Sequence, residues 1–262
     1  MSELIQWPRA KYWTAQWNPV IGCKPCSPAC ENCYAAAWAK RFGQSFKPHE
    51  TKQRPPRKGI VFCGNMTDLF GEWVDKEKSI GFISATQERR GATFLYLTKR
   101  VSRMCDTLNH GWVCEKDYHK GEDILPELLG NHYFGFTAEN HHLFSARTHQ
   151  TAGMFDNFNI WLSAEPLLGP IDLKDCYAYD GGDYKRDVIP FKWVVVGCES
   201  GPNRRQCKIE WVESIVEQCL AANVPVFVKQ LDIGGKCETD INKFPEHLRI
   251  RQVPWAKKGG AK

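Results

Sequence analysis

Seven short apolar runs, separated by segments with helical periodicity, most constrain the fold of this 262-residue chain. The runs are near-continuous rather than alternating, which is typical of strands buried on both faces of a parallel sheet. Strand and helix therefore alternate, and this order predicts an α/β fold, either a barrel or an open doubly wound sheet. The runs span residues 17–22, 60–65, 93–98, 132–137, 159–164, 193–198 and 225–230.

Five segments between the runs have helical character. The clearest, 210–225, places Trp211, Ile215, Val216 and Leu220 on one predicted face. The other four helical segments span residues 31–42, 75–90, 99–110 and 141–151. Polar stretches at about 106–130 and 172–190 predict surface insertions, and residues 256–262 predict a flexible tail.

Composition favours a single globular domain over residues 1–262, because 42% hydrophobic and 25% charged residues are ordinary values for such a domain. No apolar run approaches the roughly 18 residues that a membrane span needs, and the N-terminus lacks a signal-peptide pattern. We therefore expect a cytoplasmic protein with no membrane partner, in the host cytoplasm if a phage encodes it. The net charge of +5 permits an anionic partner but is too mild to identify one.

Four of the twelve cysteines lie together in the segment GCKPCSPACENCY, residues 22–34. Three residues between Cys26 and Cys30 are too few for an ordinary zinc ribbon or finger, and the expected compartment disfavours a disulfide. Closely spaced thiolates are typical of iron–sulfur clusters, and Cys30 and Cys33 can act with either Cys23 or Cys26. Three thiolates would leave one iron open to chelate a substrate or cofactor, whereas four would close the cluster.

The other eight cysteines are scattered singly along the chain. In a cytosolic domain of this size we expect them to be small buried residues rather than a disulfide framework. They include Cys63, Cys105, Cys114 and Cys219.

Polar side chains follow the C-terminal end of each apolar run. In a β/α barrel these ends form one rim that carries catalytic groups, and in an open sheet they meet at a crevice. For each residue alone, a helix start or a solvated charge is the alternative interpretation. Besides the cysteine loop, the rim residues are Asn65, Thr67, Asp68, Lys99, Arg100, Glu139, Asn140, Glu165, Glu199, Ser200, Lys229 and Gln230.

The spacing Cys26-x3-Cys30-x2-Cys33 is similar to the signature of radical S-adenosylmethionine (SAM) enzymes. More closely, the blocks WNPVIGCKPCSPACENCYA, NMTDLFGEWV, FLYLTKR, FGFTAEN, WLSAEPLLGPI, WVVVGCESGPNRR and VPVFVKQL resemble, in order from about residue 12 to 232, the phage Gp37/Gp68 family, a radical-SAM-like group. The resemblance implies a partial (β/α) barrel of about six to seven parallel strands, a [4Fe–4S] cluster and SAM. The C-x6-C-x2-C pattern of that family selects Cys23, Cys30 and Cys33 as ligands, whereas the standard spacing selects Cys26 in place of Cys23; we expect Cys23.

The resemblance also implies roles for the rim residues. Thr67 and Asp68, with Asn65, would hold the methionine end of SAM, the alternative being an N-cap on the following helix. Glu139, Asn140 and Ser163 would reach its ribose or carboxylate, and Gly197 with Glu199 would lie along the adenine. The candidate catalytic residues on the substrate side are Lys99, Glu165, Glu199 and Lys229, with Arg100, Arg204, Arg205 and Gln230 as further candidates.

The activity implied is that of a radical SAM enzyme, of isomerase or lyase type, that cleaves SAM reductively and abstracts a substrate hydrogen. Because the family is concentrated in phages, we expect a nucleic acid or nucleotide substrate, for example a modified thymine in phage DNA, and a reductase or flavodoxin-type electron donor. DNA lesion repair and tRNA modification are alternatives.

Two rival interpretations belong to other classes. A non-enzymatic nucleic-acid-binding protein with zinc or a closed cluster would need Cys26 as much as Cys23. A barrel hydrolase with a structural cluster would need a nucleophile–base pair, and the sequence reveals none.

Overall fold

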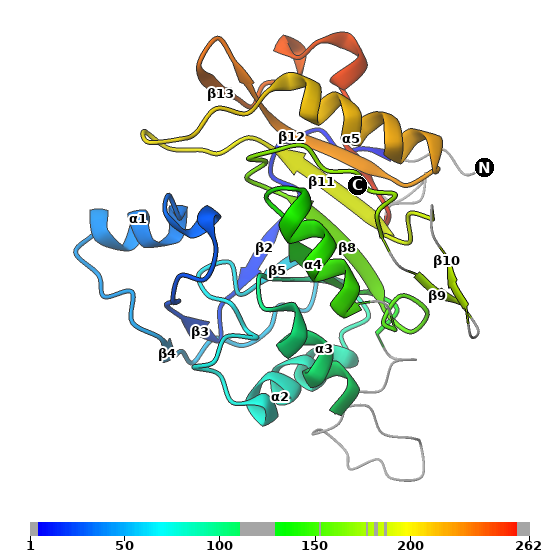
Figure 1. Cartoon of the computed structure of the whole chain (residues 1–262). Helices are drawn as coiled ribbons and strands as arrows, with labels where there is room; N and C mark the ends of the chain where they lie inside the picture. The colour runs from blue at the N-terminus through cyan, green and yellow to red at the C-terminus, as the bar shows by residue number, and fades with distance from the viewer. Residues whose placement is uncertain are drawn as a thin grey trace. The chain divides into compact units, whose positions relative to one another are not determined.

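The computed structural model describes residues 5–110, 129–151, 153–176, 178–180, 183–185 and 188–255 (Figure 1). Contacts between Cα atoms divide the chain into two compact units. The N-terminal unit comprises Trp13–Phe136 and Asp156–Asn159, and the C-terminal unit comprises Met1–Tyr12, Thr137–Phe155 and Ile160–Lys262. Each unit has its own parallel strands and helices.

The N-terminal unit is built on four parallel strands in the order β2, β5, β6, β7. Their central side chains, among them Val61, Phe94 and Phe134, are buried because both faces of the sheet are covered. The strands are β2 (Ala15–Trp17), β5 (Gly59–Cys63), β6 (Ala92–Thr98) and β7 (His132–Thr137), and the antiparallel ribbon of β3 (Val20–Ile21) and β4 (His49–Glu50) lies beside the loop with four cysteines. The helices are η1 (Pro28–Cys30), α1 (Tyr34–Arg41), α2 (Lys76–Gln87) and α3 (Val101–His110).

The C-terminal unit is built on three parallel strands, β8 (Asn159–Ala164), β11 (Trp193–Gly197) and β12 (Val226–Ile233). The far side of β12 is covered: β13 (Lys236–Glu238) pairs antiparallel with its C-terminal part, and Arg251 bridges to Phe227. The helices are α4 (His141–Thr151), α5 (Ile209–Ala221), η4 (Ile241–Lys243) and η5 (Glu246–Leu248), and the remaining strands are β1 (Ile5–Gln6), β9 (Ala178–Asp180), β10 (Asp183–Lys185) and β14 (Gln252–Val253). Helix α5 lies against β11 and β12 (Figure 1).

The predicted class, an α/β fold with the six to seven parallel strands of a partial (β/α) barrel, is confirmed. Six of the seven apolar runs are strands within three residues of the predicted bounds. The first prediction, residues 17–22, is wrong: β2 ends at Trp17, and residues 20–21 pair antiparallel with β4 instead. Pro19 lacks the amide hydrogen that continued sheet pairing requires, and it separates the two pieces.

The buried face of helix α5 is shifted from the predicted one, although both include Ile215 and Val216. Its buried residues are Val212, Ile215, Val216 and Cys219, a stripe with i, i+3, i+4, i+7 spacing. Leu220 is 48% exposed, so the prediction that it lies on the buried face is wrong. Helix α4 keeps its predicted bounds.

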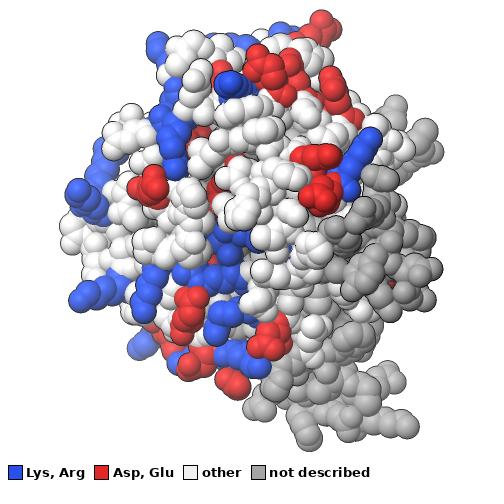
Figure 2. All heavy atoms as spheres, in the orientation of Figure 1, with Lys and Arg blue, Asp and Glu red and all other residues white. Residues whose placement is uncertain are grey.

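The predicted insertions fall on several kinds of structure. Residues 106–110 are the last turns of α3, and residues 111–128 lie outside the described chain, as does the predicted tail at 256–262. The second insertion contains the β9–β10 ribbon. Among the described residues, no helix has both the length and the apolar character that a membrane crossing requires. On the face shown in Figure 2, Lys and Arg lie interspersed with Asp and Glu.

Candidate functional site

The cysteine loop, residues 22–33, begins at a backbone position that only glycine suits. Gly22 has φ +98°, and a Cβ there would lie 2.5 Å from the carbonyl carbon and oxygen of Lys47. Its N–H donates to the carbonyl of Met66 at 3.0 Å, and its carbonyl accepts from the Thr67 hydroxyl at 2.6 Å. Gly22 therefore anchors the start of the loop to the segment that follows β5.

The end of the loop is held by two consecutive turns. Cys30 closes the helical turn η1, and Cys33 occupies the N-cap position of α1, with its N–H donating to the carbonyl of Cys30 at 3.3 Å. The Cys30 sulfur accepts a hydrogen bond from the backbone N–H of Cys26 at 3.5 Å and lies 3.7 Å from the Ser27 hydroxyl. The local backbone geometry thus places the Cys26 N–H and the Ser27 hydroxyl beside the Cys30 sulfur.

The four thiols influence one another electrostatically. The hydrogen bond from the Cys26 thiol, opposed by burial and aided by the charge of Lys99, lowers the pKa of Cys30 to about 4 and raises the pKa of Cys26. Burial is the main cause that raises the pKa of Cys23 to about 11, and charge on Asp68, Cys33 and Cys30 adds to it. Of Cys23, Cys26 and Cys30, the thiol of Cys30 is therefore the one that ionises most readily.

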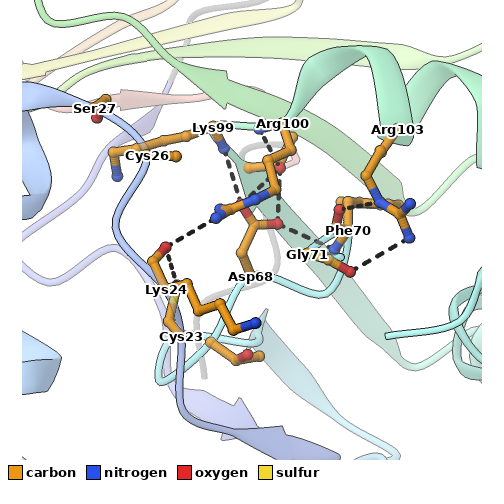
Figure 3. A network of polar contacts seen from close by, with 12 residues as sticks. Cys23, Lys24, Cys26, Ser27, Asp68, Phe70, Gly71, Lys99, Arg100 and Arg103 are labelled. Atoms are coloured by element: carbon orange, nitrogen blue, oxygen red, sulfur yellow. Dashed lines mark hydrogen bonds and ion pairs between the residues drawn. The ribbon is translucent and has the colours of Figure 1, made fainter. Parts of the chain in front are cut away.

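Arg100 ties the cysteine loop to the end of β6 (Figure 3). One guanidinium nitrogen donates to the Lys24 carbonyl at 2.8 Å, another pairs with Asp68 at 3.2 Å, and Nε contacts Glu72 at 2.9 Å. The guanidinium also lies 4.6 Å from the centre of the Trp73 ring, within cation–π range.

Asp68 is buried and has a full set of protein donors. Its carboxylate accepts from the Thr98 hydroxyl at 2.8 Å and from the backbone N–H groups of Phe70 and Lys99 at 3.0 and 3.2 Å, in addition to Arg100. In this arrangement Asp68 organises the strand ends of β5 and β6. The N-cap of α2 is Asp75, so the alternative interpretation of Asp68 as the cap of that helix is wrong.

Three other predicted residues of this unit lie around the same strand ends. Asn65 accepts from the Asn18 side chain at 2.8 Å, and its carbonyl accepts from the Tyr34 hydroxyl. Thr67 accepts from the Trp73 indole at 3.2 Å while donating to Gly22. Lys99 lies near Cys30, as its effect on the pKa of that thiol shows. The structure therefore gathers Asn65, Thr67, Asp68 and Lys99 beside the cysteine loop.

A second group of predicted residues lies in the C-terminal unit, around Glu165. The Glu165 carboxylate pairs with the Lys229 ammonium at 2.9 Å. A Cβ on Gly197 would lie 3.1 Å both from the Glu165 carboxylate and from Gln230 Cγ, so glycine permits this close approach. Gln230 itself donates to the carbonyl of Cys198 at 2.6 Å. Residues that follow β8 and end β11 thus meet residues from the middle of β12, which continues to Ile233, beyond the predicted strand end at residue 230.

Of the remaining predicted residues of this unit, Glu139, Asn140 and Glu199 bond to other protein groups, whereas Ser163 does not. Glu139 is fully buried and pairs with Arg147 at 2.7 Å, and Asn140 caps α4 by accepting from the Leu143 N–H at 3.0 Å. Glu199 accepts from the backbone and side chain of Arg205 at 2.8 and 3.0 Å. The Ser163 hydroxyl is buried and lacks a hydrogen-bond partner among the described residues.

A cavity of about 1270 Å³ lies in the C-terminal unit, between the start of α5 and the β12–β13 turn. Its wall combines the cationic Arg204, Lys208 and Lys243 with the aromatic Trp211 and Phe244. Arg204 pairs with Asp232 at 2.8 Å, which fixes its guanidinium at the wall. Of the predicted site residues, only Arg204 lines this cavity.

Sequence reasoning missed some of the residues that hold the loop. Lys24 contributes its backbone carbonyl, which no side-chain pattern marks, and Glu72 and Trp73 lie inside the quoted NMTDLFGEWV block but were given no role.

The donor set of the loop is four thiols, the ligand type that holds iron–sulfur clusters. Among the described residues, no group of three His, Cys, Asp or Glu side chains is arranged to hold a single metal ion. The N–H directed at the Cys30 sulfur is the kind of contact that tunes cluster sulfurs.

Comparison with solved structures finds two weak likenesses. Spore photoproduct lyase complexed with dinucleoside spore photoproduct shares 15% identity over 56% of this chain and 44% of its own, with a TM-score of 0.33. PhdJ bound to substrate intermediate shares 11% identity over 84% of this chain and 61% of its own, with a TM-score of 0.32. The chain thus spans less than two thirds of either protein.

No curated protein matches the chain. A family model, described as protein of unknown function (DUF5131), matches residues 8–252, which include the cysteine loop and both groups of strand-end residues. The resemblance to the phage Gp37/Gp68 family stays a prediction. The chain belongs to the DUF5131 family.

Proposed function

We propose that the cysteine loop binds a [4Fe–4S] cluster through Cys23, Cys30 and Cys33 and that the protein is a radical SAM enzyme. The observation that carries the proposal is the Cys30 sulfur, which accepts the Cys26 N–H and shares one short loop with three further thiols. Held by these three thiolates, such a cluster would supply the electron for reductive cleavage of SAM.

One observation favours Cys23 over Cys26 as the third ligand. Cys23 follows the anchored Gly22, and its own N–H donates to the carbonyl of Phe46 at 3.3 Å. A ligand on a fixed backbone loses less freedom when it binds.

The chain's own residues would position the reactants. Arg100 holds the loop backbone at Lys24, and Lys99 places a cation near Cys30. In the C-terminal unit, the Ser163 hydroxyl has a hydrogen bond to give, and the Lys229–Glu165 pair offers both a donor and an acceptor. We assign Asn65, Thr67, Asp68, Glu139, Asn140, Ser163, Gly197 and Glu199 to SAM binding and Lys99, Glu165, Glu199 and Lys229 to the substrate side.

The substrate that we propose is a nucleobase adduct, such as a modified thymine in DNA, with lesion repair or tRNA modification as alternatives. The large cavity supports this class, because its cationic wall suits phosphate and its aromatic rings suit base stacking. A cytoplasmic flavodoxin-type protein or reductase would deliver the electron. A reaction of isomerase or lyase type follows from the same proposal.

The test is anaerobic reconstitution with iron and sulfide, reduction, addition of SAM and chromatographic detection of 5′-deoxyadenosine. We expect the product from the native chain and from Cys105→Ala, a matched control that removes a buried thiol outside the loop. Cys23→Ala should abolish it, and Cys26→Ala should retain it. A loaded cluster that yields no 5′-deoxyadenosine would contradict the radical SAM assignment.

The second candidate function is a non-enzymatic protein with a closed four-cysteine site, and the Cys26–Cys30 hydrogen bond favours it because Cys26 lies within reach of the same site. It predicts that Cys23→Ala and Cys26→Ala lose bound metal equally. Iron and zinc content of the two variants therefore separates the candidates without any activity assay.

A further inference from the structure

Helix α1 reverses the usual order of burial. Its buried residues are the small Ala35 and Ala39, whereas its large aromatic side chains are exposed. Tyr34, Trp38 and Phe42, the residue that follows the helix, are 55%, 46% and 57% exposed. They are three of the five exposed large hydrophobic side chains in the described part of the chain. Because α1 packs through its alanines, its rings contribute little to the core, and such a cluster of exposed rings marks a site of interaction.

The three rings lie along one side of the helix, which we call the aromatic face. A spacing of four residues places Tyr34, Trp38 and Phe42 on successive turns, about 6 Å apart along the axis. The ring centres of Trp38 and Phe42 are 4.8 Å apart, and the Arg41 guanidinium lies 5.8 Å from the centre of the Phe42 ring. The Tyr34 hydroxyl donates to the carbonyl of Asn65, which fixes the first ring. The aromatic face thus combines flat rings with a cation beside them.

The chain from α1 to the start of β5 is strongly basic. Residues 34–58 contain seven Lys or Arg and one acidic residue, so their net charge exceeds the +5 of the whole chain. The acidic residue, Glu50, pairs with Lys78 of α2. All seven cationic side chains are exposed, and none forms an ion pair with another residue that the structure describes. These cations are Lys40, Arg41, Lys47, Lys52, Arg54, Arg57 and Lys58.

Contacts with the end of β2 hold the basic chain in place. The Thr51 hydroxyl donates to the carbonyl of Asn18 at 2.6 Å, and the Gln53 side chain accepts from the Asn18 N–H at 2.9 Å. Alternate residues of an extended chain point to opposite sides, and Lys52 and Arg54, which flank Gln53, are exposed. These two cations are therefore presented to solvent from an anchored backbone.

We infer that the aromatic face and the cations of residues 40–58 together bind single-stranded nucleic acid, with bases stacked on Trp38 and Phe42 and phosphates paired with the cations. Exposed rings beside a cationic track are the combination with which proteins hold single strands. The inference goes beyond the proposed function, because it assigns a strand-binding surface to the N-terminal unit and needs neither the cluster nor SAM. Since Cys33 is the N-cap of α1, the strand is held beside the cysteine loop.

Two other anionic partners fit the surface less well. A helix that lies on a membrane inserts a stripe of large apolar side chains, whereas the eight residues of α1 include four alanines and no larger aliphatic side chain. An acidic protein would pair with the cations, but it can cover the rings with any apolar group. A nucleobase instead needs an aromatic ring on which to stack. Replacing a ring by an aliphatic side chain of similar size therefore separates these partners.

The test is fluorescence anisotropy of a labelled single strand of about 20 thymidylates, titrated with the full-length protein. Trp38→Leu should weaken binding about fivefold to a hundredfold, because it removes one stacking ring, and Trp38→Phe should retain most of the affinity. Leu220→Ala is the matched control, since it removes an exposed apolar side chain of the C-terminal unit and should leave binding unchanged. Thermal unfolding checks that each variant is folded.

The phosphate contacts are read from the salt dependence of the same binding. Lys52→Gln combined with Arg54→Gln should reduce the slope of log Kd against log salt by about 1.4, because each phosphate contact of a single strand contributes about 0.7. The control combines Lys174→Gln with Lys192→Gln, which removes two exposed cations of the C-terminal unit and should leave the slope unchanged.

Several outcomes overturn the inference. These are absence of binding to the strand, full affinity in Trp38→Leu, and a slope that the two cation pairs change equally. Polyglutamate or phosphatidylserine vesicles that displace the strand from Trp38→Leu as well as from the native chain would assign the surface to an acidic protein or a membrane. Formation of 5′-deoxyadenosine is measured separately and should be unchanged in Trp38→Leu, so failure of this surface and failure of the radical SAM proposal appear in different assays.

Discussion

The guanidinium of Arg100 donates a 2.8 Å hydrogen bond to the backbone carbonyl of Lys24, the residue that follows Cys23. A side chain at the end of β6 thereby fixes the backbone of a loop 76 positions earlier in the chain. The same guanidinium pairs with Asp68, and both side chains are only 8% exposed. The position of the first cysteine therefore depends on a buried ion pair rather than on the loop sequence alone.

Arg100→Gln should destabilise the protein by about 3 kcal/mol, because removing one partner leaves the Asp68 charge buried and unpaired. Urea unfolding measures the change. Lys76→Gln, which removes an exposed pair with Asp106, is the control and should cost less than about 1 kcal/mol. Equal effects of the two substitutions would show that the Arg100 pair contributes no more than a surface contact.

Gly22→Ala should lower both stability and the iron content after reconstitution. A left-handed backbone costs a residue with a Cβ about 1–2 kcal/mol, and overpacking against the Lys47 carbonyl adds about 1–3 kcal/mol. Gly43→Ala is the matched control, since Gly43 has φ +61° but open space at its Cβ. Thermal unfolding and iron analysis of both variants test whether the clash displaces the loop; similar values for the two would argue against it.

Stability should fall below pH 6.5 because of His132. Burial, with the charge of Arg90, lowers the pKa of His132 in the folded protein from 6.5 to about 3. Above pH 6.5 the ring is neutral in both states, and between pH 6.5 and 3 the unfolded chain binds a proton that the folded chain does not. Each pH unit in that window should therefore cost up to about 1.4 kcal/mol.

The comparison that checks this is urea unfolding at pH 7.5, 5.5 and 4.5 in the native chain and in His132→Phe. Phenylalanine keeps a ring between Phe94 and Phe134, which both stack on His132, but cannot bind a proton. The variant should be less stable at pH 7.5, since it loses the contacts to Thr86 and Asn131, yet its pH slope should be shallower. Parallel slopes would refute the assignment.

Ser163→Ala should stabilise the protein by about 1 kcal/mol, because a buried hydroxyl without a partner carries an uncompensated desolvation cost. Ser79→Ala should have the opposite sign, since the buried Ser79 hydroxyl donates to the Leu69 carbonyl at 2.8 Å. If Ser163 binds SAM, equilibrium dialysis should show weaker SAM binding in the stabilised variant. A loss of stability in Ser163→Ala would mean that the hydroxyl is satisfied.

The sequence predicted the strands better than the contacts between them. The run at 132–137 is β7 without change, because a stretch buried on both faces is apolar throughout. The run at 17–22 failed because hydropathy does not report that Pro19 interrupts pairing. The side-chain pattern likewise placed Leu220 on the buried face of α5, whereas the buried residue is its neighbour Cys219.

The candidate site likewise contains residues that the sequence could predict and contacts that it could not. The spacing of Cys23, Cys30 and Cys33 marks a candidate ligand set because those residues are local. The contact of Arg100 with Lys24 depends on which segments become neighbours, and no local pattern encodes that. Backbone acceptors such as the Lys24 carbonyl are not marked by residue type at all.

The covered side of β12 limits how another protein can dock on the C-terminal unit. Its C-terminal part pairs with β13, the Val228 N–H donates to the Ile250 carbonyl at 2.8 Å, and Arg251 donates to the Lys229 carbonyl at 3.3 Å. A sheet edge whose donors and acceptors are already used cannot accept a strand from a second molecule. β12 is therefore protected from fibril-like stacking on this side, and a protein that docks against it must recognise side chains and turns instead of pairing with its backbone.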